Sequence, residues 1–75
     1  MTEQEKLEKF TDTIECEHPE HVKPDTVLKD IDEWDSMAMI SVITMLATKF
    51  GRTLTYDELK GLVHVSDVLV LMENA

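Results

Sequence analysis

One serine in the sequence lies where its hydroxyl could take part in the transfer of a chemical group. Ser36 follows Asp35 and precedes Met37–Phe50, a stretch that contains no proline, no glycine and no acidic residue. Asp and Ser are both favoured N-cap residues, because their side-chain oxygens accept hydrogen bonds from free N–H groups of the first helical turn. The sequence therefore predicts a hydroxyl at the positive end of a helix, where backbone N–H groups favour a phosphate.

The surroundings of Ser36 differ from those of a catalytic serine. A serine nucleophile needs an adjacent base, and no Gly-x-Ser-x-Gly turn surrounds Ser36. The nearest histidines, His18 and His21, belong to a segment that we expect to be a loop. We therefore predict no catalytic residue and no enzymatic activity, and interpret Ser36 as the acceptor of a group that another enzyme attaches. A plain N-cap is the alternative role, and the commoner one for a serine in this position.

Four residues match a zinc site only in part. Cys16, His18 and His21 have ligand-like spacing, and His64 could be a fourth ligand. Zinc sites usually contain tighter pairs such as Cys-x-x-Cys, which this sequence lacks. Short Cys/His tracts are common without a metal, so we predict no zinc site.

Three acidic residues match an EF-hand loop only in part. They are Asp30, Asp32 and Asp35. Trp34 occupies the fifth position, and the glycine and the closing glutamate of such a loop are absent. We therefore predict no calcium site either.

The helix behind Ser36 has an apolar stripe and a defined end. Four apolar residues recur at helical spacing, so they lie on one face of a helix over residues 37–50. They are Met39, Ile43, Leu46 and Phe50. Gly51 suits the left-handed conformation in which many helices end. We expect this stripe to face the core.

A first helix and a long loop precede this main helix. Thr2 and Glu5 form a capping box, and Pro19 should end the helix near residues 15–17. The loop over residues 18–33 is longer than most connections, with a short helical turn expected at Asp25–Lys29. Buried apolar side chains should hold it in place, namely Val22, Val27, Leu28 and Ile31. We expect Trp34 to pack on the first turn of the main helix.

Two more helices are predicted after Gly51. Thr55 and Glu58 form a second capping box, and Gly61 weakens the end of the short helix that follows. Ser66 is expected to cap the last helix, which runs to Met72. The predicted fold is all-α, with three main helices and a short third one.

Composition limits the possible functions. The chain has 75 residues and a net charge of −9, which argues against nucleic acid as a ligand. Cys16 is the only cysteine, so no disulfide forms within the chain and a reducing cytoplasm is expected. The amino terminus is charged, unlike a signal peptide, and no apolar run is long enough to span a membrane. We expect one monomeric domain over residues 1–75.

The motif around Ser36 resembles that of the acyl carrier protein family, whose members share an Asp-Ser-Leu-type motif at the start of the second helix of a four-helix bundle. The matching string is Leu28-x-x-Ile31-x-x-Trp34-Asp35-Ser36-Met37, followed by apolar spacing to Phe50-Gly51. Leu54, Tyr56-Asp57-Glu58-Leu59 and Val65-Ser66-Asp67-Val68 match the third helix and the start of the fourth. The resemblance covers essentially the whole chain.

The resemblance implies a carrier function. Ser36 would receive 4′-phosphopantetheine from coenzyme A through a phosphopantetheinyl transferase, and the thiol of this arm would carry an acyl or aminoacyl group as a thioester. Asp35 would help to hold Mg²⁺ and coenzyme A in the transferase complex. Loading and transferring enzymes would act on the bound group, in fatty acid, polyketide or secondary-metabolite biosynthesis. Met37 replaces the usual leucine and keeps an apolar contact.

The second helix departs from the family pattern in its charge. Fatty acid carriers usually present several acids there, whereas the positions expected to face outward here are uncharged. They are Ala38, Ser41, Thr44, Ala47 and Thr48. We therefore expect a specialised carrier of an accessory pathway that binds its partners through an uncharged surface. The residues predicted for this surface are Met37, Ile40, Ser41, Thr44 and Ala47; the alternative is that Met37 and Ile40 turn inward.

Two further expectations follow from the resemblance. An acyl chain would lie between the second and third helices, in a space that is small or collapsed when the carrier is unloaded. Its lining would be Met39, Ile43, Leu46, Leu54, Leu59 and Leu62. The alternative function is a small acidic helical interaction module without a prosthetic group, in which Ser36 is merely a helix cap.

Overall fold

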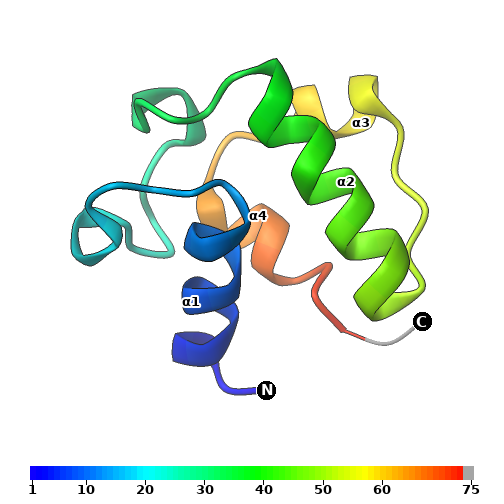
Figure 1. Ribbon diagram of the computed structural model, residues 1–75, viewed down its shortest axis with the longest axis horizontal. Coiled ribbons are helices and arrows are strands. Elements are labelled where there is room, and N and C mark those ends of the chain that lie inside the picture. Colours follow the sequence, from blue (N-terminus) through cyan, green and yellow to red (C-terminus); the bar gives the residue numbers. More distant parts are fainter. Residues whose placement is uncertain (74–75) are drawn as a thin grey trace.

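The longest element of the computed structural model is helix α2 (Ser36–Phe50), which packs against α1 and α3 (Figure 1). The structure describes residues 1–73. The carboxylate of Asp35 caps α2 by accepting a hydrogen bond from the N–H of Ala38 at 2.9 Å. Gly51 ends the helix in the left-handed conformation, with φ at 65°, as the sequence predicts. The cap is therefore Asp35, and Ser36 is the first helical residue.

Helix α1 (Glu3–Thr13) begins at the predicted capping box. Glu5 accepts from the N–H of Thr2 at 2.8 Å, and Thr2 accepts from the N–H of Glu5 at 3.1 Å. The helix ends two residues before the expected limit, because Glu15 adopts a left-handed conformation with φ at 54°. The N–H of Cys16 then bonds to the carbonyl of Thr11 at 2.9 Å, which closes a Schellman-type end without a glycine.

The segment over residues 14–35 connects α1 to α2 and contains two 3₁₀ turns, η1 (Pro19–His21) and η2 (Leu28–Asp30). The turn expected at Asp25–Lys29 thus lies three residues later, and η1 was not predicted. Three of the four expected apolar anchors are buried, namely Val22, Leu28 and Ile31, and Val27 is half-buried. The predicted long loop is confirmed, and it is anchored to the core.

Backbone hydrogen bonds tie this connecting segment to the start of the last helix. The N–H of Leu28 bonds to the carbonyl of Val63 at 2.8 Å, and the N–H of Val65 to that of Thr26 at 2.9 Å. The N–H of Ser66 bonds to the carbonyl of Pro24 at 2.8 Å. Within residues 1–73, the one β-type pairing is the isolated antiparallel bridge at the centre of this contact, between residues 27 and 64.

The last two helices are short. Helix α3 (Tyr56–Lys60) begins at the predicted capping box of Thr55 and Glu58. Helix α4 (Val65–Leu69) begins after His64, and the expected Ser66 cap is wrong. Asp67 fixes this start because its carboxylate accepts from the N–H groups of Val63 and His64 at 3.2 and 3.0 Å. The last helix was also predicted to be one of the three main helices and to reach Met72. This prediction is wrong, because the chain continues in turns after Leu69.

The core lies between α1, α2 and α4, with α3 packed on α2. Its largest fully buried side chains are Phe10, Val42, Leu28, Leu46, Leu59, Val65, Val68 and Met72. The arrangement of the described residues is all-α, with two longer and two shorter helices. Within residues 1–73, no helix combines the length and the apolar character needed to cross a membrane.

The buried face of α2 is rotated from the predicted stripe. Leu46 and Phe50 are buried as expected, but Met39 and Ile43 are only partly buried. Ala38, which was expected to face outward, is buried. The other buried residues of α2 are Val42 and Met45. The buried face is rotated because α2 packs against both α1 and α3. Residues of α2 that point toward either helix are therefore covered.

Trp34 packs against an aromatic ring of α1. Its ring lies 5.8 Å from the ring of Phe10, with the planes tilted by 36°. Tilted aromatic pairs at this distance are favourable. Trp34 therefore joins the connecting segment to α1, and its packing on the first turn of α2 stays a prediction.

Candidate functional site

The start of α2 presents a hydroxyl that has no role in capping its own helix. Ser36 is exposed, and it is the first residue of a fifteen-residue helix. Asp35 supplies the capping oxygen, so the Oγ of Ser36 is not needed to satisfy the first-turn N–H groups. The sequence had offered both residues as caps. The structure separates their roles, with Asp35 as the cap and Ser36 as an accessible hydroxyl.

The side chain of Ser36 meets that of Tyr56. Its Oγ lies 3.2 Å from the Oη of Tyr56, which is long for a hydrogen bond between two hydroxyls. Tyr56 is the first residue of α3 and is exposed. Sequence reasoning placed Tyr56 on the third helix but gave it no role, because nothing local shows that the starts of α2 and α3 meet. The contact gives Ser36 a weak partner that a modifying enzyme could displace.

The polar groups before Ser36 are acidic, whereas the helix after it is not. The segment contributes Asp32, Glu33 and Asp35 immediately before the serine, while α2 contains no acid and one base, Lys49. The N–H of Glu17 donates to Glu33 at 3.3 Å and is the main reason why the pKa of that carboxyl lies below its usual value. The site therefore combines an acidic rim, made of Asp32, Glu33 and Asp35, with a helix end that carries partial positive charge.

One face of α2 is exposed and uncharged. Its members are the residues predicted for partner binding, Met37, Ile40, Ser41, Thr44 and Ala47. They follow one another at helical spacing and so lie on one side of the helix. Met37 is 72% exposed and Ile40 51%, so the alternative that both turn inward is wrong. We call these five residues the neutral face of α2.

An open hollow of about 300 Å³ lies at the Ser36 end of α2. Two members of the neutral face, Met37 and Ser41, border it, and so does Asp35. Ala38 of α2 and Glu33 also line it, and the end of α1 and the residues after it complete the lining through Thr13, Ile14 and Glu15. The hollow therefore adjoins the site on the α1 side, whereas Tyr56 contacts Ser36 from α3.

The six residues expected to line an acyl site all belong to the core or its edge. Leu46 and Leu59 are fully buried. The other four, Met39, Ile43, Leu54 and Leu62, are partly buried and pack against the core. No charged side chain occurs among the six, so displacing them by an apolar chain would cost mainly repacking.

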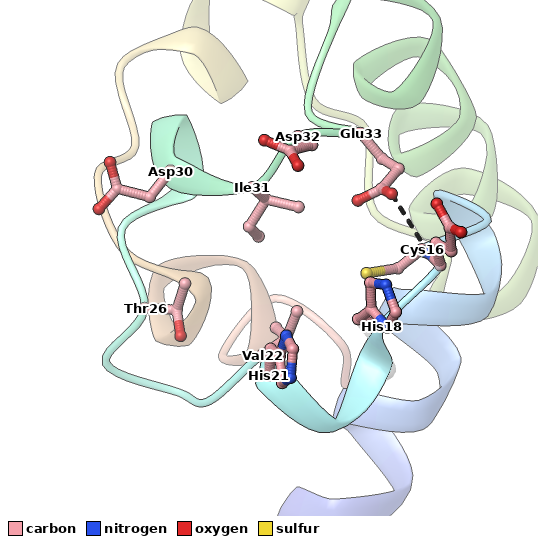
Figure 2. Close-up of a pocket in the computed structure, with 10 residues that line it drawn as sticks. Cys16, His18, His21, Val22, Thr26, Asp30, Ile31, Asp32 and Glu33 are labelled. Atoms are coloured by element: carbon pink, nitrogen blue, oxygen red, sulfur yellow. Dashed lines mark hydrogen bonds between the residues drawn. The ribbon is translucent and has the colours of Figure 1, made fainter.

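The possible metal ligands are divided between two places. His18 and His21 lie together on η1, and Cys16 lines the same open hollow as both of them (Figure 2). His64 lies at the start of α4 and is not part of this group. Asp30 and Asp32 also line that hollow, while Asp35 caps α2 instead. Glu20, which the sequence indicated only as a surface residue of the loop, joins the two histidines.

Comparisons of the chain with protein-family models, with curated proteins and with solved structures found no match. Its function is therefore inferred from its own residues and their geometry.

Proposed function

We propose that this chain is an acyl or aminoacyl carrier protein that bears 4′-phosphopantetheine on Ser36. One observation carries the proposal: Ser36 begins the longest helix with an exposed hydroxyl, while Asp35 performs the capping. Esterification of Ser36 would then leave the helix cap in place. The phosphodiester would lie at the helix N-terminus, where its charge is favoured.

The surrounding fold supports this assignment. The described helices follow the order that the resemblance implies, with a long connection before α2 and a short α3 beside it. Asp35 lies next to the acceptor and is exposed, so a transferase could use it to hold Mg²⁺ and coenzyme A. Tyr56 would release Ser36 at small cost, because their contact is long and solvent can replace it.

The neutral face of α2 suggests which partners the carrier serves. Loading and transferring enzymes would pack on Met37 and Ile40, since exposed apolar side chains grouped in this way mark contact sites. The absence of acids on α2 favours an accessory pathway over housekeeping fatty acid synthesis. The protein would act as a monomer in the cytoplasm and perform no catalysis itself.

A second candidate function is an interaction module without a prosthetic group. The same exposed Met37 and Ile40 favour it, because a contact surface does not require a modified serine. In that case Ser36 would be an ordinary first-turn residue hydrogen-bonded to Tyr56. The two functions differ in whether Ser36 accepts a group.

The test is an intact-mass measurement after incubation with coenzyme A, Mg²⁺ and a broad-specificity phosphopantetheinyl transferase. We expect one phosphopantetheinyl group on the wild-type chain and none on Ser36→Ala. Thr53→Ala is the matched control, because Thr53 is an exposed hydroxyl residue outside the neutral face of α2 and should not affect the addition. No addition under conditions that load a known carrier would contradict the carrier proposal and favour the interaction module.

A further inference from the structure

The turn η1 and the residue before it bring two histidines and a glutamate together. One ligand atom of each of His18, Glu20 and His21 lies within 4.8 Å of the other two. The imidazole rings of the histidines are stacked, with centroids 5.2 Å apart and planes 22° apart. In a 3₁₀ turn, side chains three residues apart eclipse each other, which explains why these two rings face one another.

The backbone holds this arrangement in place. The N–H of His21 bonds to the carbonyl of His18 at 3.0 Å, and Pro19 restricts the turn between them. The N–H of the buried Val22 bonds to the carbonyl of Pro19 at 3.1 Å and fixes the turn to the core. The donor groups therefore stand on a preorganised backbone, and only side-chain rotations separate them from a common ligand.

One carboxylate oxygen lies near a nitrogen of each ring. The Oε2 of Glu20 is 3.5 Å from the Nδ1 of His18 and 3.8 Å from the Nε2 of His21. Both separations exceed the usual length of an N–H···O hydrogen bond, so neither contact satisfies the donors well. The pKa of the Glu20 carboxyl is lowered, chiefly by a hydrogen bond from its own backbone N–H.

We propose that His18, Glu20 and His21 bind a zinc ion. Two imidazoles and one carboxylate are a ligand set that Zn²⁺ accepts in proteins, with water in the fourth position. The three side chains are 61, 66 and 74% exposed for His18, Glu20 and His21, so water can complete the coordination. Imidazole ligands also favour transition metals over Mg²⁺ and Ca²⁺, which prefer oxygen ligands.

The nearby cysteine is not a member of the set. The sulfur of Cys16 borders the adjoining hollow beside His18 (Figure 2). It does not belong to the cluster of donor atoms that His18, Glu20 and His21 form. The proposed ligand set therefore contains no sulfur.

Calorimetric titration of the full chain, without a histidine tag, with Zn²⁺ tests the proposal. We expect one zinc per chain, no displacement by a large excess of Mg²⁺, and weaker binding as the pH falls and protons compete for the imidazoles. His18→Ala, His21→Ala and Glu20→Gln should each weaken binding by at least about tenfold, the loss seen even for residues outside the ligand shell. Circular dichroism of each variant checks that it folds.

Matched controls use the same residue types outside the cluster. His64→Ala and Glu17→Gln should bind zinc like the wild type, and Cys16→Ser should too. The Co²⁺-loaded protein should lack the charge-transfer band of a thiolate ligand. No saturable binding, equal binding by His18→Ala, or a comparable loss in His64→Ala or Cys16→Ser would overturn the proposal. Ser36→Ala should retain zinc, so this result is independent of the carrier function.

Discussion

Two neighbouring parts of the chain, the connecting segment (residues 14–35) and helix α2, have opposite chemical character. The connecting segment carries half of the sixteen acidic residues, whereas α2 carries none. The connecting segment has little regular structure and depends on buried anchors and on bonds to the start of α4. Helix α2 satisfies its own backbone and exposes a neutral face. The serine proposed to be modified lies at the boundary between them.

This difference suggests that this small protein interacts with its partners in two ways. Charged groups act over about 10 Å at moderate ionic strength and mainly raise association rates. Uncharged, partly apolar groups act only on contact and through packing. The acidic segment would attract cations or basic surfaces, and the neutral face of α2 would select a partner by its shape.

The comparison is tested first by replacing one buried leucine in each part. Leu46 of α2 and Leu28 of the connecting segment are 0% and 1% exposed. Each change to alanine should cost about 2–5 kcal/mol, because a buried leucine leaves a cavity. That is a large part of the stability of so small a domain, so both variants should be mostly unfolded at 37 °C by circular dichroism.

A much smaller loss for Leu28→Ala than for Leu46→Ala would show that the connecting segment is held less firmly than its burial indicates. Val70→Ala serves as the control, since Val70 is exposed and its truncation should change the free energy of unfolding by less than about 0.5 kcal/mol.

The second prediction concerns the missing acids of α2. With Ser41 and Ala47 both replaced by Glu, the phosphopantetheinylated chain should be used several-fold better by a housekeeping ketosynthase, because the new charges attract its basic surface. Its cognate partner should gain nothing, and that reaction should depend weakly on salt. The measurement is kcat/KM at low and high ionic strength.

The control is the replacement of both Ser41 and Ala47 by Asn, since it alters the shape of the surface without adding charge. If the unchanged carrier already serves the housekeeping enzyme as well as that enzyme's own carrier does, the idea of a specialised carrier is wrong.

The third prediction uses the strained end of α1. Glu15 has a positive φ, a conformation that costs a residue with a Cβ about 1–2 kcal/mol. Glu15→Gly should therefore stabilise the protein by about 1 kcal/mol and raise Tm by about 4–8 °C. Thermal unfolding followed by circular dichroism measures this. Glu17→Gly removes a nearby acid where φ is not positive and should give no gain; equal gains would point to charge rather than strain.

The smallest expected effect is the acid sensitivity of the junction between the connecting segment and α4. The N–H groups of His64 and then Val63 lower the pKa of Asp67, so the folded state favours the ionised carboxylate. This contribution is present above the unfolded pKa, near 4 for an aspartate, and is lost as the pH falls through the lower folded value. Asp67→Asn should therefore reduce Tm slightly at pH 7 and flatten its decline below about pH 4.

Asp57→Asn is the matched control for this measurement, because it removes the same charge from the first turn of α3. If the Tm of Asp67→Asn declined at low pH as steeply as that of the wild type, the two backbone hydrogen bonds would not contribute to the pH dependence.

The features that the sequence predicted well are local. The capping boxes at Thr2 and Thr55 and the left-handed Gly51 each depend on residues within one helical turn. The identity of Ser36 as an exposed hydroxyl at a helix start follows from the same short-range rules. Such features are decided before distant parts of the chain meet.

The features that the sequence missed depend on distant partners or on strain. The contact of Tyr56 with Ser36 and the packing of Trp34 on Phe10 join elements far apart in the chain. The rotation of the buried face of α2 follows from which helices flank it. Glu15 has a left-handed conformation that glycine usually adopts, so the residue type at this position did not predict it. The triad on η1 could have been found had a 3₁₀ turn been expected after Pro19.

The backbone pairing between the connecting segment and the start of α4 also bears on the order in which the chain folds. It joins residues on either side of α2, so a long loop must close before these bonds can form. Helix α2 needs no such closure, because its backbone hydrogen bonds join residues four apart. The pairing should therefore be a late step in folding, and the amide hydrogens of Leu28 and Val65 should exchange with solvent before those in the middle of α2.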